Sequence, residues 1–142
     1  MPAQAFEVAF NGYWREPKIS GLPAQSGVFC VYVCSYNPAD KAVVLLRLLY
    51  IGETGNANGT IAQDRLWPEW KAALRHPNQQ ICFSFAPVES RSRRQVAAAL
   101  IHAHQPPGND EFKTNFPYEP TVVTISGRAD LLKAKVTANA EE

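Results

Sequence analysis

The sequence predicts an α+β fold in which helices flank a small, mainly antiparallel β-sheet. Two apolar runs, residues 27–36 and 43–51, follow each other with only a short polar turn between them. A third such run, residues 80–88, lies between two stretches whose apolar residues have helical spacing. Strands and helices in this order, with no linker between them, predict a single domain over residues 1–142.

The first two runs are expected to pair as a hairpin. Residues 27–36 are almost wholly β-branched, aromatic or small, and a turn sequence at Pro38 follows them. A parallel pair would need a long crossover, so the short connection to residues 43–51 favours an antiparallel arrangement. Residues 53–59 are rich in glycine and asparagine and are expected to form a loop.

Two helical segments are expected on either side of the third strand. Residues 60–75 carry apolar side chains at mixed three- and four-residue spacing, which predicts a helix that is broken or kinked near Pro68. Ser90 or Ser92 is expected to cap the second helix, whose alanine-rich apolar face ends before Pro106.

The two ends of the chain are expected to add further elements to this core. Residues 6–14 suggest an edge strand, and residues 121–125 a β-strand. Residues 129–135 suggest a short helix after a turn, and the acidic residues 141–142 suggest a frayed end.

Composition limits the classes of partner and location. A net charge of +1 makes any contact with nucleic acid depend on a local basic patch. No secretory leader and no apolar run of membrane-spanning length is present, so we expect no membrane partner and a cytoplasmic location. Cys30, Cys34 and Cys82 lie inside strand-like runs and are expected to be buried reduced thiols.

Three segments in this order resemble the GIY-YIG nuclease superfamily. They are the SGVF start at Ser26, the LLYIGETGN block around Tyr50, and the RRQVAAALIHAHQPPGN stretch that ends at Asn109. The resemblance covers about residues 26–109. It implies the family's compact order of strand, strand, helix, strand and helix, with a catalytic cleft at one face of the sheet.

The resemblance implies one-metal phosphodiester hydrolysis, in which a tyrosine activates water, an arginine stabilises the developing charge and a helix glutamate holds a divalent ion. Such chemistry needs fixed cations and an anionic oxygen ligand for a hard metal. Tyr50 matches the tyrosine of the second family motif, and Gly52 matches its glycine. Asn109 fits the asparagine that commonly follows the last helix.

Three positions depart from the family pattern. The first tyrosine falls on Phe29, which has no hydroxyl. The arginine position aligns with Thr60, although Arg65 is a possible substitute about one and a half turns later. The metal-binding glutamate falls on Ala97, whose methyl group binds no metal. The resemblance therefore indicates ancestry more strongly than activity.

Further polar residues are candidates for binding. Glu53 directly follows the matched glycine and could supply an acid, although a solvated loop carboxylate is the ordinary reading. Arg93 and Arg94 lie at the start of the last helix, where the positive end of the helix dipole disfavours cations. Their position favours an anionic partner, and a solvated cluster is the alternative.

These observations leave three functional hypotheses. The first is a catalytically degenerate nuclease homologue, natural or engineered, that binds DNA, other nucleic acid or another partner through the former active-site cleft and needs no cofactor. The second is an active Mg²⁺-dependent DNA endonuclease that uses Tyr50 and Arg65 with an acid such as Glu53. The third is a protein-interaction module, in line with the near-neutral charge and the aromatic content.

Overall fold

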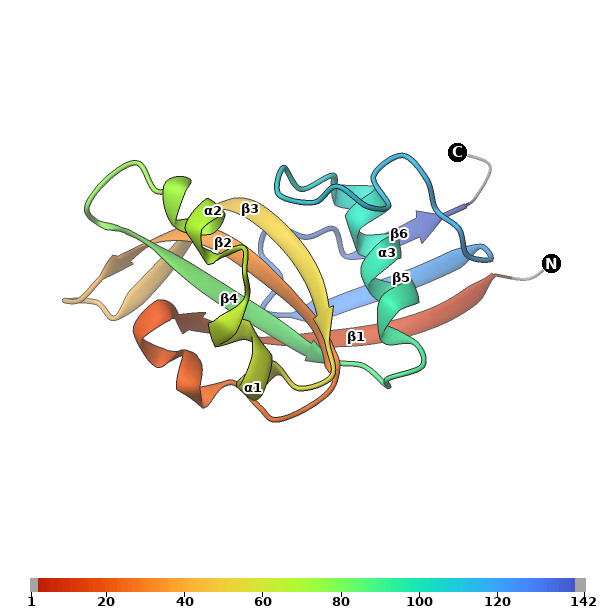
Figure 1. Ribbon diagram of the computed structural model, residues 1–142, viewed down its shortest axis with the longest axis horizontal. Coiled ribbons are helices and arrows are strands. Elements are labelled where there is room, and N and C mark those ends of the chain that lie inside the picture. Colours follow the sequence, from red (N-terminus) through yellow and green to blue (C-terminus); the bar gives the residue numbers. More distant parts are fainter. Residues whose placement is uncertain (1–2, 140–142) are drawn as a thin grey trace.

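A curled six-stranded β-sheet forms the centre of the protein in a computed structural model, which describes residues 3–139 (Figure 1). The strand order is β3-β2-β4-β1-β5-β6, and only β1 and β5 pair in parallel. The mixed α+β class is thus confirmed. The elements are β1 (Gln4–Arg15), η1 (Glu16–Gly21), β2 (Gly27–Asn37), β3 (Ala42–Thr54), α1 (Ala57–Thr60), η2 (Ile61–Gln63), α2 (Trp67–Ala72), β4 (Gln79–Pro87), α3 (Arg93–His104), β5 (Thr121–Gly127) and β6 (Lys135–Ala138).

The predicted hairpin is confirmed. Strands β2 and β3 are antiparallel from the pair Gly27 and Thr54 to the pair Asn37 and Ala42. On its other side β2 pairs with β4, so both of its edges are occupied. Because β2 also has layers over both faces, its side chains from residue 27 to residue 34 are buried, which explains its unbroken apolar sequence.

Side chains alternate between two cores on opposite faces of the sheet. Val28 and Tyr32 of β2 pack against α3, and Val31 and Val33 pack against α1, η2 and α2. The three cysteines are buried and free, as expected. None of the helices between residues 3 and 139 has the length and apolarity that a membrane span requires.

Four expectations are corrected. The strand at residues 6–14 belongs to β1, which is an interior strand between β4 and β5 and not an edge strand. Residues 129–135 form turns that lead into β6 instead of a helix, and Leu132 N donates to Ala129 O in a turn at 3.0 Å. The helical segment expected over residues 60–75 is broken near Pro68, as predicted, but its pieces are shorter than expected: η2 ends at Gln63, and α2 begins at Trp67 with Pro68 in its first turn.

The fourth correction concerns the helix cap. Ser92 occupies the N-cap position of α3, but its side chain makes no capping hydrogen bond. Ser90 instead directs its hydroxyl toward Ser26 Oγ, at 3.4 Å. The expected frayed acidic end, residues 141–142, lies outside the described residues.

The loop after α3 covers the outer edge of β3. Gly108 N donates to Leu49 O at 2.7 Å, and the side chain of Asn109 bonds the backbone of Ile51. An edge strand otherwise presents unpaired backbone groups to solvent. This loop therefore closes one side of the sheet and brings its own side chains next to the end of β3.

Candidate ligand-binding cleft

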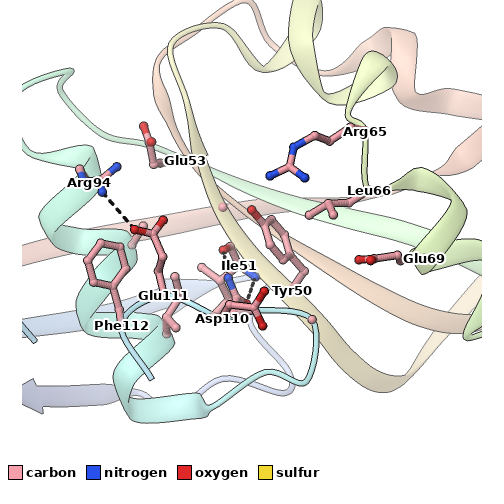
Figure 2. A pocket seen from close by; sticks show the side chains of 15 residues that line it. Tyr50, Ile51, Glu53, Arg65, Leu66, Glu69, Arg94, Asp110, Glu111 and Phe112 are labelled. Carbon is pink, nitrogen blue, oxygen red and sulfur yellow. Dashed lines mark hydrogen bonds and ion pairs between the residues drawn. The ribbon is translucent and has the colours of Figure 1, made fainter. Parts of the chain in front are cut away.

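A cleft of about 300 Å³ lies beside the carboxyl-terminal half of β3 (Figure 2). One wall is formed by α3 and the loop that follows it, and the other by the turn before α2 and by α2 itself. The lining residues are Tyr50, Ile51, Gly52, Glu53, Arg65, Leu66, Glu69, Arg94, Ala97, Ile101, Gly108, Asn109, Asp110, Glu111 and Phe112. Most of the candidate site residues predicted from the sequence therefore lie in this one cleft.

Tyr50 is fixed by aromatic packing. Its ring centroid lies 6.1 Å from that of Phe29 and 5.7 Å from that of Trp70. Burial raises the pKa of the Tyr50 hydroxyl above its ordinary value, and the Asp64 carboxylate adds to the rise, whereas the Arg65 guanidinium opposes it. At neutral pH the cleft therefore contains a protonated phenol, which can donate a hydrogen bond.

Arg65 faces this phenol from the opposite wall. It lies in the turn between η2 and α2, where Leu66 N donates to Asp64 Oδ1 at 2.9 Å. This contact is an Asx turn, which fixes the backbone on both sides of Arg65. Figure 2 shows the guanidinium and the Tyr50 hydroxyl extending toward each other. Arg65 is exposed and forms no ion pair with any residue from 3 to 139.

The three departures from the family pattern have different surroundings. Ala97 is buried on α3 and lines the cleft with a methyl group. Phe29 lies behind Tyr50 in the core and does not line the cleft. Thr60 lies outside the cleft and shares a short hydrogen bond between its hydroxyl and that of Thr54.

Glu53 and Arg93, both predicted binding residues, contact each other. Arg93 Nε donates to Glu53 Oε1 at 2.5 Å, and Arg93 Nη1 lies 3.3 Å from Ser26 Oγ. Both charged side chains are less than a third exposed. Arg93 does not line the cleft, so the pair joins the start of α3 to the end of β3.

Arg94 does line the cleft. Its Nη2 lies 3.5 Å from Glu111 Oε2, and its Cζ lies 5.2 Å from the ring centroid of Phe112. The charge of Arg94 is thus partly offset, while the guanidinium remains at the cleft wall (Figure 2).

Gly52 and Asn109 are enclosed. A Cβ at Gly52 would meet Phe29 Cζ at 2.5 Å and Tyr50 Cε2 at 2.8 Å. Only glycine fits beside these two rings. The amide oxygen and nitrogen of Asn109 are both bonded to the Ile51 backbone, at 2.9 Å and 2.8 Å. Asn109 therefore shapes the cleft by holding the loop after α3 against the backbone of β3 through its side-chain amide.

Sequence reasoning missed the other polar residues of the cleft. Glu69 comes from α2, whereas Asp110 and Glu111 come from the loop after α3, which also contributes the aromatic ring of Phe112. The available signal was an acidic pair directly after Asn109, a residue already expected at the site. Between residues 3 and 139, no group of three or more His, Cys, Asp or Glu side chains is arranged to hold a metal ion.

No protein-family model, curated protein or solved structure matches this chain.

Proposed function

We propose that this protein is a GIY-YIG-like nuclease homologue that no longer cleaves and that binds a nucleic-acid phosphodiester in the cleft. The observation that carries the proposal is the convergence of the Tyr50 phenol and the Arg65 guanidinium on a cavity that Ala97 also lines. A neutral phenol and a guanidinium are both hydrogen-bond donors, and an anionic oxygen accepts from both.

The same arrangement disfavours hydrolysis. A phenol with a raised pKa stays protonated at neutral pH and so cannot take a proton from water, and the position that the resemblance assigns to a metal-binding carboxylate carries a methyl group. Arg65, next to the phenol, pairs with no carboxylate of residues 3–139, whereas Arg93 and Arg94 contact carboxylates. Because four carboxylates, Glu53, Glu69, Asp110 and Glu111, also line the cleft, it suits one phosphate held by Tyr50 and Arg65 better than an extended backbone.

Fluorescence anisotropy with a labelled single-stranded oligonucleotide tests this function. One neutralised phosphate predicts weak binding, with a slope of log K against log salt concentration of about −0.7. Tyr50→Phe should weaken binding by about tenfold to a hundredfold, because it removes one hydrogen bond to a charged group and keeps the ring. An affinity that is absent, or that does not change with salt, contradicts the proposal.

A second candidate is an active Mg²⁺-dependent endonuclease, favoured by Asp110 and Glu111 in the same cleft. Their carboxylates are hard oxygen ligands of the kind that Mg²⁺ prefers. Incubation with supercoiled plasmid and Mg²⁺, with and without chelator, separates the two candidates. Nicking that needs metal and disappears in Tyr50→Phe would establish the enzyme, whereas intact plasmid supports the binding protein.

A further inference from the structure

Arg94, Glu111 and Phe112 form a layered arrangement on the wall of the cleft opposite Arg65 (Figure 2). The Phe112 ring lies against the Arg94 guanidinium, with 5.2 Å between Cζ and the ring centroid. Glu111 Oε2 approaches Nη2 of the same group at 3.5 Å. The Arg94 side chain nevertheless remains 56% exposed.

The backbone of Phe112 is held in an unusual conformation. Its φ is +67°, in the left-handed region that bulky residues rarely adopt. The Phe112 carbonyl accepts from His102 Nδ1 at 3.1 Å, and the Lys113 carbonyl accepts from Gln105 Nε2 at 2.6 Å. Two hydrogen bonds from the last turns of α3 and its C-cap thus fix the loop that presents this ring to Arg94.

We propose that the Arg94 guanidinium, backed by the Phe112 ring, is a stacking platform for one unpaired nucleobase. Guanidinium planes and aromatic rings are both surfaces on which splayed bases stack in single-stranded nucleic acids. Glu111 only partly offsets the charge of Arg94, so the property that distinguishes Arg94 from a lysine at this position is the flat surface of its guanidinium. This inference rests on the proposed function, since the phosphate next to the base is the one that Tyr50 and Arg65 bind.

The size of the cleft favours an unpaired nucleotide over a duplex. About 300 Å³ lies at the lower end of the range of ~300–1,000 Å³ for small-ligand pockets. A paired base in a double helix cannot enter such a space without being extruded from the stack. The ligand class is therefore single-stranded nucleic acid.

The test compares an oligothymidylate with a fully abasic oligomer of the same length and backbone, by fluorescence anisotropy. The wild-type protein should prefer the oligothymidylate by about tenfold, the size of one stacked base. Arg94→Lys keeps the charge and loses the plane, so the oligothymidylate affinity should fall toward the abasic affinity and most of this preference should disappear. Phe112→Leu should have the same effect, with folding verified by thermal denaturation, whereas Arg65→Met should weaken both oligomers equally.

Equal binding of both oligomers by the wild-type protein overturns the stacking platform and leaves the phosphate site standing. An Arg94→Lys protein that loses affinity equally for both oligomers also overturns it, because Arg94 then contacts the backbone that both oligomers share and not a base. Failure of both oligomers to bind overturns the proposed function, and the stacking platform falls with it.

Discussion

The side-chain amide of Asn109 pairs with the backbone of Ile51 as a neighbouring strand would. Ile51 N donates to Oδ1 at 2.9 Å, and Nδ2 donates to Ile51 O at 2.8 Å. Asn109 is only 6% exposed, so water cannot replace these contacts. A single side chain therefore closes the edge of β3 directly beside Tyr50 and fixes one end of the cleft.

Asn109→Ala should lower the free energy of unfolding by about 2–4 kcal/mol, because two buried backbone groups lose their partners. Urea denaturation measures this change. Asn37→Ala is the matched control: that amide bonds Asp40 and the Ala39 backbone at the surface, and its loss should cost less than about 1 kcal/mol. Equal costs for the two variants would show that the Ile51 pairing adds no stability.

Gly52→Ala should destabilise the protein and displace the Tyr50 ring. The new methyl group would lie 2.5 Å from Phe29 Cζ, a distance that forces one ring to move. We expect a loss of about 1–3 kcal/mol and weaker oligonucleotide binding. Gly55→Ala is the control, because its methyl group would only reach ordinary contact with Arg93 Nη1 at 3.5 Å. Similar melting temperatures for the two variants contradict this account.

The strands β2, β3 and β4 and the helix α3 were predictable because each has a local apolar pattern of the right length. The position of β1 was not, since its parallel partner β5 lies more than a hundred residues away and local alternation does not reveal it. The apolar residues near Leu132 suggested a helix, yet turn contacts and pairing of β6 with β5 determine that segment.

In the candidate site, too, some residues could be predicted from the sequence and others could not. Tyr50, Gly52 and Ala97 were selected only because the resemblance implies site residues at these positions, and all three line the cleft. The pairing of Arg93 with Glu53, and the return of the loop carrying Glu111, depend on tertiary contacts that the sequence does not encode locally. The positions of the charged residues in the sequence therefore did not predict which arginine side chains pair with carboxylates in the folded protein.

Arg65 and Arg93 should have opposite roles. Arg65→Met removes an unpaired cation from the cleft and should reduce oligonucleotide affinity by about tenfold, with little change in stability. Arg93→Met breaks the partly buried contact with Glu53 and should cost about 1 kcal/mol of stability, with affinity nearly unchanged. Urea denaturation and anisotropy on both variants measure the two effects. A larger loss of affinity in Arg93→Met than in Arg65→Met contradicts the assignment.

His104 should make stability depend on pH. Nδ1 donates to Leu100 O at 2.8 Å and Nε2 accepts from Lys133 N at 2.9 Å, so the folded protein holds a neutral imidazole. Burial lowers the pKa of His104 below its ordinary value, and Lys133 adds to this. The unfolded chain therefore binds the proton first as pH falls. The contribution of neutral His104 to the stability of the folded protein is complete above a pH of about 6.5. It declines below that value, toward the lowered pKa.

Urea denaturation at several pH values measures this dependence, with a slope of at most about 1.4 kcal/mol per pH unit for one proton. His104→Gln should remove that part of the slope. His76→Gln, at an exposed position, is the control and should leave the slope unchanged. A wild-type curve that coincides in slope with that of His104→Gln would show that this imidazole is not linked to folding.

Mg²⁺ at millimolar concentration should leave the melting temperature of the wild-type protein unchanged, because Ala97 offers no carboxylate and no described acidic cluster is arranged around an ion. Ala97→Glu should introduce a Mg²⁺-dependent stabilisation, of about 1.4 kcal/mol when the free metal is tenfold above its Kd. Differential scanning fluorimetry measures both.

Ala97→Gln separates metal binding from the steric effect of a longer side chain, since it has the same shape and no charge. Ala97→Glu alone should still leave supercoiled plasmid intact, because Phe29 provides no hydroxyl and Thr60 no guanidinium. A strong Mg²⁺ stabilisation of the wild-type protein would instead place a metal at Asp110 or Glu111. That result, together with plasmid nicking, would mean that the metal-binding carboxylate lies in the loop after α3 and not on α3. It would favour the endonuclease.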